Sequence, residues 1–355
     1  MSEPRDAGVL ITIRDVAALA GVALSSVSRV LSGHPDVSVT MRTRVEAAAK
    51  DLGYEPDLLA QSLRRGSTQT VGFVLRDISN PLFANIARRC EQELRRSGYS
   101  MVLMNSDGGV EAESANLTLM RRRRVDGVIV SLVSETSVAT RQALSALRVP
   151  VVLLDREVEG FTAAAVLCDH YSGVRRAVEE LLMRAHTRVA LITGQLDVRT
   201  SRERVRAYRD AFAAAQVDVD EGLVLPGGFS VDYAKSETIR LFSRSPRPTA
   251  MVTGGVGSTA GTLRALHQLR RTPGRDVAIV ALDEWPMFDV FAPNLASVAR
   301  DSDEMGTASA RLLLDMLNGA NPHTVIIDTS FIPRASLGQP LSGAPGRPTA
   351  AVAEP

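Results

Sequence analysis

The sequence has little of what secreted, membrane-spanning and metal-dependent proteins require. Its 355 residues include two cysteines, Cys90 and Cys168, and five histidines without ligand-type spacing. Two cysteines build neither a disulfide framework nor a typical zinc site, so we expect buried free thiols and no metal. No apolar run reaches the roughly 18 residues of a transmembrane helix, and the polar N-terminus lacks a signal-type apolar stretch. These absences predict a cytoplasmic protein without a membrane partner.

Signals of catalysis are missing as well. The sequence contains no phosphate-binding P-loop, no nucleophile elbow and no His-x-x-x-His pair. Gly255-x-Gly257 lacks the third glycine of a dinucleotide fingerprint, since residue 260 is alanine, and it follows a late strand. We therefore predict no enzyme, no catalytic residues and no cofactor.

Aromatic residues are scarce at 4%, but 45% of the chain is hydrophobic, so its cores must rest on aliphatic side chains. The length predicts two or three compact units. The net charge of +1 neither favours nor excludes a polyanionic partner.

The residue pattern of the N-terminal segment predicts helices only. Thr12 to Asp15 form a capping-box-like start for a helix with Val16, Ala17, Leu19 and Ala20 on its apolar face, ended by Gly21. A second helix follows over 24–31, and a third, capped by Ser38, runs to about Leu52. Helix, short turn and helix is the geometry that places a second helix in the DNA major groove.

The outward face of the second helix carries hydrogen-bonding side chains, namely Ser25, Ser26, Ser28 and Arg29, with Leu24 at its start. Arg29 can bond guanine or a phosphate, and Leu24 can contact a thymine methyl. The alternative is a three-helix bundle with a solvated second helix. It gains support from residues 1–66, which hold eight Lys/Arg and eight Asp/Glu, whereas DNA-binding domains are usually basic.

From residue 70 onward, apolar strands alternate with amphipathic helices, which predicts parallel, doubly wound sheets. The expected strands cover 71–75, 99–104, 127–132, 151–154, 164–167, 188–192, 223–225, 250–253, 277–281, 297–299 and 325–331. The expected helices cover 82–97, 111–122, 137–147, 171–184, 201–215, 232–243, 258–269 and 303–317. This alternation of strands and helices occurs in two successive sets, so we expect two α/β subdomains with a cleft between them. That is the layout of periplasmic sugar-binding proteins.

Ordered motifs along residues 10–337 resemble the lactose/galactose repressor family of transcription regulators. They are Thr12 to Ala17, Ala20-Gly21-Val22, Val27 to Leu31, Val37-Ser38, Leu52-Gly53-Tyr54, Ala60 to Arg64, Val71-Gly72 and Ser79 to Phe83. The resemblance implies an α/β fold with an all-α helix-turn-helix domain at 10–57 and a hinge helix at 58–66. A periplasmic-binding-protein-type core follows at 69–337, its N-subdomain at about 69–167 and 299–324 and its C-subdomain at about 168–298 and 325–337. We expect a disordered arm at 1–9 and a disordered tail at 338–355.

The resemblance also implies roles at matching positions in DNA binding. Leu24, Ser25 and Arg29 would read bases, and Ser28, Ser38 and Tyr54 would hold phosphates; Thr12 and Ser26 complete this predicted face. Leu63, beside Ala60 and Arg64, would be an apolar wedge in the minor groove, unless it is a plain linker leucine. The implied partner is a pseudo-palindromic double-stranded operator bound by a homodimer. Ala23 stands where the family has a capping Ser or Thr, and its loss should weaken the recognition helix.

Ligands of open α/β sheets bind beyond the carboxyl ends of the strands. The candidates there include Asn80, Phe83, Asp155, Arg199, Thr200, Arg204, Phe229 and Asp283. Aromatic faces with arginine and aspartate suit a sugar or related polar metabolite, and the resemblance assigns Arg204 and Asp283 to an allosteric effector. For Asp155 and Arg156 a structural pair between the subdomains is the alternative.

Two departures from the family pattern bear on the effector. Gly255-Val256 replaces an Asn-Asp or Gly-Asp pair, and Arg300-Asp301 replaces Gln-Pro. The effector is therefore less hydroxylated, differently charged or absent. We expect a repressor of a carbohydrate operon; the alternatives are a regulator without effector and a solute-binding module or enzyme.

Overall fold

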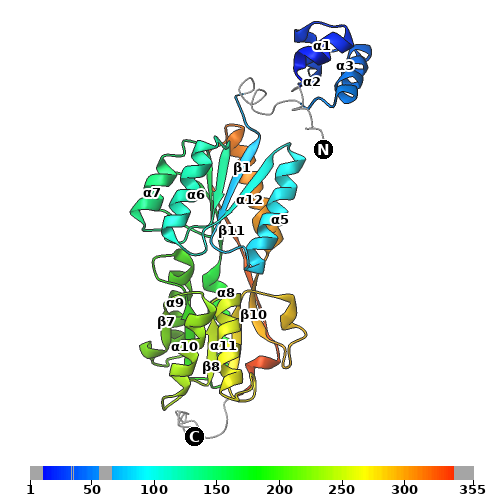
Figure 1. Ribbon diagram of the computed structural model, residues 1–355. Coiled ribbons are helices and arrows are strands. Elements are labelled where there is room, and N and C mark those ends of the chain that lie inside the picture. Colours follow the sequence, from blue (N-terminus) through cyan, green and yellow to red (C-terminus); the bar gives the residue numbers. More distant parts are fainter. Residues whose placement is uncertain (1–10, 33, 35, 56–65, 340–355) are drawn as a thin grey trace, which may run out of the picture. The chain divides into compact units, whose positions relative to one another are not determined.

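The structure, a computed structural model, describes residues 11–32, 34, 36–55 and 66–339 (Figure 1). It consists of two compact units, 1–69 and 70–355. The expected arm, nearly all of the hinge helix and most of the expected tail lie outside the described residues.

The first unit contains α1 (Ile13–Ala20), α2 (Leu24–Leu31) and α3 (Val39–Leu52), as predicted. Val16, Val27 and Val45 are fully buried at the centre of the three helices. Leu19, which we expected inside, is 54% exposed. At about 100° per residue it lies roughly 110° from the centre of the stripe that the buried residues of α1 form, so it falls beyond the edge of the core.

Local contacts hold the helix-turn-helix. The N–H and the hydroxyl of Thr12 donate to Asp15 Oδ2 at 2.7 and 2.8 Å, which confirms the capping start of α1. Gly21 ends α1 with φ 61°, a conformation that favours glycine. Arg44 of α3 donates to the carbonyls of Ala20 and Gly21, which ties the turn to the third helix.

The second unit contains two six-stranded sheets. Sheet A has the order β11-β5-β4-β3-β1-β2, and all its pairs are parallel. Its strands are β1 (Thr70–Leu75), β2 (Ser100–Asn105), β3 (Gly127–Val130), β4 (Val151–Leu154), β5 (Ala164–Cys168) and β11 (Thr324–Ile327). In Figure 1, α6 (Val110–Arg122) and α7 (Val138–Ser145) lie on one side of it, and α5 (Pro81–Arg96) and α12 (Ser302–Leu317) on the other.

Sheet B has the order β12-β10-β9-β8-β6-β7, parallel except for the antiparallel pair of β10 and β12. Its strands are β6 (Val189–Thr193), β7 (Val224–Pro226), β8 (Ala250–Thr253), β9 (Ala278–Leu282), β10 (Ala296–Arg300) and β12 (Thr329–Ile332). α8 (His170–Met183) and α9 (Arg199–Ala214) pack on one face, and α10 (Val231–Phe242) and α11 (Val256–Gln268) on the other. Short 3₁₀ turns occupy Glu221–Leu223, Pro286–Phe288 and Ala335–Leu337. The two predicted doubly wound subdomains are confirmed.

The chain passes between the two sheets at 168–170, 300–302 and 327–329. The last passage corrects one expectation. The apolar run 325–331, expected as one strand, is divided at Asp328 into β11 of sheet A and β12 of sheet B. Apolar patterning marks extended backbone but does not say which sheet it joins, so the division was not visible in the sequence. In the described part of the chain, no helix is long and apolar enough to cross a membrane.

Candidate nucleic-acid interface and ligand cavity

The face of α2 that we predicted to meet DNA is open to solvent. Leu24 is 44% exposed, Ser25 and Arg29 are exposed, and Ser26 and Ser28 are half-buried. Within the described segments, Arg29 forms no ion pair. Ala23 occupies the N-cap position without a side-chain hydrogen bond, which confirms the missing cap. This face therefore presents one guanidinium and several small hydroxyl groups. They lie on a helix whose first turn receives no hydrogen bond from a capping side chain.

The other predicted DNA-binding residues fall into three groups. Thr12 and Ser38 serve as helix caps, and the Ser38 hydroxyl accepts from the Met41 N–H at 3.3 Å. Tyr54 is half-buried against the core of the three helices. Ala60, Leu63 and Arg64 lie outside the described residues. The roles of all these residues toward DNA remain predictions.

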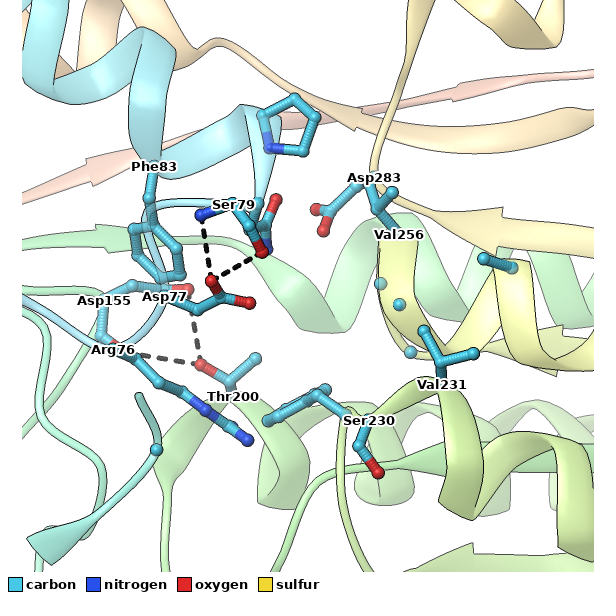
Figure 2. A pocket seen from close by; sticks show the side chains of 18 of the residues that line it. Arg76, Asp77, Ser79, Phe83, Asp155, Thr200, Ser230, Val231, Val256 and Asp283 are labelled. Carbon is cyan, nitrogen blue, oxygen red and sulfur yellow. Dashed lines mark hydrogen bonds between the residues drawn. The ribbon is translucent and has the colours of Figure 1, made fainter. Parts of the chain in front are cut away.

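A cavity of about 430 Å³ lies in the second unit, at the carboxyl ends of strands from both sheets. Its size is in the lower half of the range for small-molecule sites. Of the eight predicted effector residues, seven line it: Asn80, Phe83, Asp155, Thr200, Arg204, Phe229 and Asp283. Figure 2 shows Phe83, Arg76, Thr200, Ser230 and Asp283 around this space.

Arg199, the eighth, does not line the cavity. Its guanidinium donates to the Cys168 carbonyl at 3.0 Å and lies 3.4 Å from Glu157. Its N–H donates to Glu135. Arg199 and Thr200 are consecutive residues at the start of α9, so their side chains point in different directions. Thr200 lines the cavity, and Arg199 does not.

Arg300 joins the two aspartates of the cavity. Its Nε donates to Asp283 Oδ1 at 2.7 Å, its Nη2 contacts the same oxygen, and its Nη1 donates to Asp155 Oδ2 at 2.9 Å. The Arg300 side chain is only 8% exposed. Burial alone would lower the pKa of Arg300, but Asp283 and Asp155 raise it above its ordinary value. In the sequence Arg300 stood out only as a departure from the family pattern and was not predicted in the site, although its position at the end of a strand was a usable signal.

Asp155 is held as a carboxylate in the interior. Burial alone would raise its pKa, but His170, Arg300 and Arg156 hold the pKa well below its ordinary range. Burial lowers the pKa of His170 to about 4, so this ring is neutral near pH 7 and bonds Asp155 through Nε2 at 2.8 Å. Asp155 and Asp283 have φ of 55° and 152°, so both carboxylates sit on strained backbone.

Asp155, Cys168 and His170 place ligand-type atoms within 4.8 Å of one another. Burial raises the pKa of the Cys168 thiol, which keeps it protonated, and the Arg300 guanidinium is already bonded to Asp155. A protonated thiol and the positive charge of Arg300 at Asp155 both disfavour a cation at this cluster.

Arg204 is 2% exposed and donates through Nη1 to the Gly254 carbonyl at 2.9 Å. Its Nε is buried and has no acceptor in the described part of the chain. Its guanidinium lies 5.8 Å from the centre of the Phe229 ring, and that of Arg76 lies 5.0 Å from the same centre. Sequence reasoning missed Arg76, which follows β1 directly. Gly194 makes room for the Phe229 ring, since a Cβ there would lie 2.1 Å from it.

Polar contacts join the two subdomains beside the cavity. Arg156 Nη1 donates to Thr200 Oγ1 at 3.2 Å, and Nε donates to the Leu132 carbonyl at 2.7 Å. Glu135, between β3 and α7, accepts from the Arg199 N–H and from Arg202 Nη2 at the start of α9. Arg156 therefore connects the two subdomains through Thr200, in keeping with the structural alternative given for it, and it also lines the cavity.

Comparisons with known proteins agree with this geometry. Residues 12–57 match a model described as bacterial regulatory proteins, lacI family, and residues 178–337 match a periplasmic binding protein-like domain. The ribose operon repressor of Escherichia coli K12 is 31% identical over 304 residues, covering 85% of this chain and 92% of the relative. The structure of a transcriptional regulator CelR–cellobiose complex is 30% identical, with a TM-score of 0.70, covering 92% of this chain and 99% of that one. A LacI family regulator from Enterococcus faecium with bound ribose is 26% identical, with a TM-score of 0.68, covering 77% and 99%. The chain thus belongs to the LacI family of bacterial transcription regulators.

Proposed function

We propose that the protein is a cytoplasmic, homodimeric repressor of a carbohydrate uptake or catabolism operon, controlled by a small polar ligand, and that it is not an enzyme. The observation that carries the proposal is a cavity lined from both sheets in a chain that also has an open helix-turn-helix. The name of the ribose operon repressor, and the ribose and cellobiose bound by the two similar structures, support a carbohydrate operon.

In this proposal each protomer reads one operator half-site with α2. Arg29 pairs with guanine O6 and N7 or with a phosphate, and Leu24 contacts a thymine methyl. Residues 11–55 hold five Lys/Arg and five Asp/Glu, so non-specific attraction to phosphates is weak. Specific affinity must then come from base contacts, from dimerisation and from the predicted Leu63 wedge flanked by Ala60 and Arg64.

Control by the ligand follows from the contacts between subdomains. Arg300 joins Asp283 to Asp155, and Glu135 holds the start of α9, so both subdomains meet around the cavity. A ligand that binds one relative angle of the subdomains better than another shifts the population toward that angle. We infer that this shift orders or releases residues 58–65, the predicted hinge helix, and so changes operator affinity.

The test is binding of the full chain to DNA from upstream of its own gene, measured by fluorescence anisotropy against a scrambled duplex. If Arg29 pairs with guanine, Arg29→Ala should weaken specific binding by about 1–3 kcal/mol, roughly 5- to 150-fold, and leave scrambled binding almost unchanged, whereas a phosphate contact would be lost on both duplexes. Lys50→Ala, at an exposed position in the last turn of α3, is the matched control. The proposal fails if even low salt yields no specific complex, or if both variants lose affinity equally. Leu63→Ala should also reduce specific binding more than scrambled binding.

A regulator that needs no ligand is the second candidate. The observation in its favour is that Arg300 already joins both cavity carboxylates. Thermal shift of the full chain separates the two candidates, because a ligand that binds the native state raises its melting temperature. Flat melting temperatures across neutral and charged sugars would favour the second candidate.

A further inference from the structure

The cavity has an excess of positive charge in its buried part. Asp155, Asp283, Arg156 and Arg204 are each at most 4% exposed, and Arg300 lies between the two aspartates. Among the buried residues that line the cavity, three guanidiniums therefore face two carboxylates, and the buried Glu135 and Glu113 behind the lining compensate Arg156. Two further carboxylates line the cavity outside this buried part: Asp77 is half-buried and accepts from Ser79, and Asp107 is exposed. A buried cation without its own counter-ion is unfavourable, and a bound anion would remove that cost.

The groups that would recognise a neutral sugar are occupied or missing. Sugar hydroxyls donate to carboxylates, but the Asp155 and Asp283 oxygens that face Arg300 already accept from it. Gly255 and Val256, at the start of α11, line the cavity and present no polar side-chain atom. Gly255 has φ 135°, so a longer side chain there would be strained. Arg300 thus competes with a polyol for the buried acceptor oxygens that face it in the cavity.

Two guanidiniums remain to receive an anion. Among the described residues, the buried Nε of Arg204 has no acceptor. Its Nη1 donates one hydrogen bond, to the Gly254 carbonyl. Burial and the nearby Arg300 lower the pKa of Arg204 to about 10, although Asp283 and Asp155 act in the opposite direction without forming an ion pair with it. In the described chain Arg76 has no ion pair; Asp77 and Asp197 act on it only from beyond ion-pair distance. Both guanidiniums lie within 6 Å of the Phe229 ring centre, so they converge on one space.

We propose that the ligand of this cavity is a monosaccharide-sized anion whose carboxylate or phosphate bonds to Arg204 and Arg76. The proposal rests on the function proposed above and names the ligand class. Planar guanidinium forks match both groups, and Phe229 and Phe83 offer aromatic surface to the C–H groups of the sugar. Arg76 follows a strand of sheet A and Arg204 belongs to α9 on sheet B. One anion therefore bonds to both subdomains at once and favours their closed arrangement.

The experiment is isothermal titration of the full-length protein with ribose, ribonate and ribose 5-phosphate, and with inorganic phosphate as the control for a bare anion. At least one anionic sugar should bind ten times more tightly than ribose or more, and the stronger of the two identifies carboxylate or phosphate as the natural group. Arg76→Gln should remove most of that preference, and Arg76→Lys should restore part of it. Arg141→Gln, at an exposed position of α7, is the matched control and should change nothing.

Arg300→Gln should reverse the preference of the cavity for anions over ribose. It frees acceptor oxygens on Asp155 and Asp283, so ribose should gain affinity while the anions lose their advantage. Ribose binding as tightly as both anions, no binding by either anion at millimolar concentration, or anion binding unchanged by Arg76→Gln would each overturn the proposal. Failure of the DNA experiment together with anion binding would instead overturn only the proposed function. A specific DNA complex without anion binding would overturn only the ligand class.

Discussion

The helix α2, predicted to read the operator, lacks a side-chain cap, and Ala23→Ser should supply one. Ala23 has φ −67° and ψ 149°, almost the conformation of Ser38, which has φ −61° and ψ 147° and caps α3 through its hydroxyl. The Ala23 carbonyl already accepts from Ser26 and Val27 at 2.9 and 3.2 Å, but its methyl group offers nothing to the first turn. A serine hydroxyl at this site should therefore stabilise α2 by about 1 kcal/mol, about fivefold in the opening equilibrium.

Native-state hydrogen exchange on the full chain measures this change. Amide protection over residues 24–31 should rise about fivefold in Ala23→Ser, and protection of the second unit should not change. Ala47→Ser is the control, because Ala47 is exposed inside α3, where serine is slightly unfavourable. Unchanged protection of α2, or an equal rise in the control, would refute the argument that the missing cap limits this helix.

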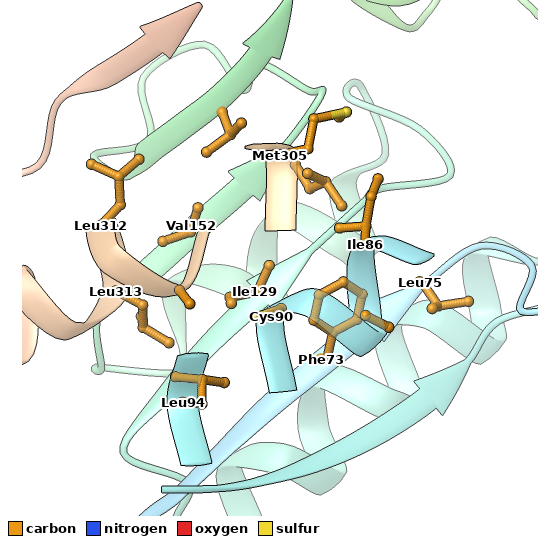
Figure 3. Close-up of a cluster of buried hydrophobic side chains, with 14 of the residues drawn as sticks. Phe73, Leu75, Ile86, Cys90, Leu94, Ile129, Val152, Met305, Leu312 and Leu313 are labelled. Carbon is orange, nitrogen blue, oxygen red and sulfur yellow. The ribbon is translucent and has the colours of Figure 1, made fainter. Parts of the chain in front are cut away.

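Three further predictions concern the second unit. Phe73→Ala should lower its free energy of unfolding in urea by about 3–5 kcal/mol, because Phe73 is fully buried between β1 and the helices of that face (Figure 3). Burial raises the pKa of Glu113 from 4.5 to about 6, so the ionisation of this carboxyl alone should lower the free energy of unfolding by roughly 2 kcal/mol as pH rises through this interval. Glu113→Gln should flatten that dependence in urea titrations at several pH values. Gly257→Ala should lower the melting temperature, because its Cβ would lie 2.5 Å from the Phe229 carbonyl oxygen.

Each of these has an outcome that contradicts it. Phe73→Ala should cost far more than Val138→Ala, since Val138 is 69% exposed, and similar losses would mean that the cluster around Phe73 is loosely packed. An unchanged pH slope in Glu113→Gln would mean that this carboxyl titrates normally. An unchanged melting temperature in Gly257→Ala would mean that the start of α11 moves freely.

Strand and helix positions followed from the sequence because both sheets are buried on two faces and their strands are continuous apolar runs. Six of the strands are fully buried over their whole length: β3, β4, β5, β6, β8 and β9. The position of Phe229 after a strand, and the resemblance at Arg204 and Asp283, were enough to place these three side chains at the cavity.

The site features that the sequence did not predict depend on contacts between residues that are far apart along the chain. Arg300 meets Asp155 across 145 residues, and neither residue carries a local signal of the other. Arg76 matters because its guanidinium lies against a ring that the other sheet supplies. Arg199 and Thr200 differ by one step at a helix start, and only the observed phase of α9 separates them.

The passages of the chain between the two sheets also set the order in which the subdomains are completed. On the ribosome, β1 to β5 emerge early, but α12 and β11, which cover one face of sheet A and pair with β5, emerge only after nearly all of sheet B. The part of the apolar face that α12 covers beside α5, and the edge of β5, therefore stay uncovered while some 130 further residues are synthesised, roughly 10 s at bacterial elongation rates. During that interval β5 is an open parallel edge of apolar residues, the kind of surface that pairs with other chains. Aggregation in the nascent state, more than the stability of the finished fold, should limit the yield of this protein when it is expressed.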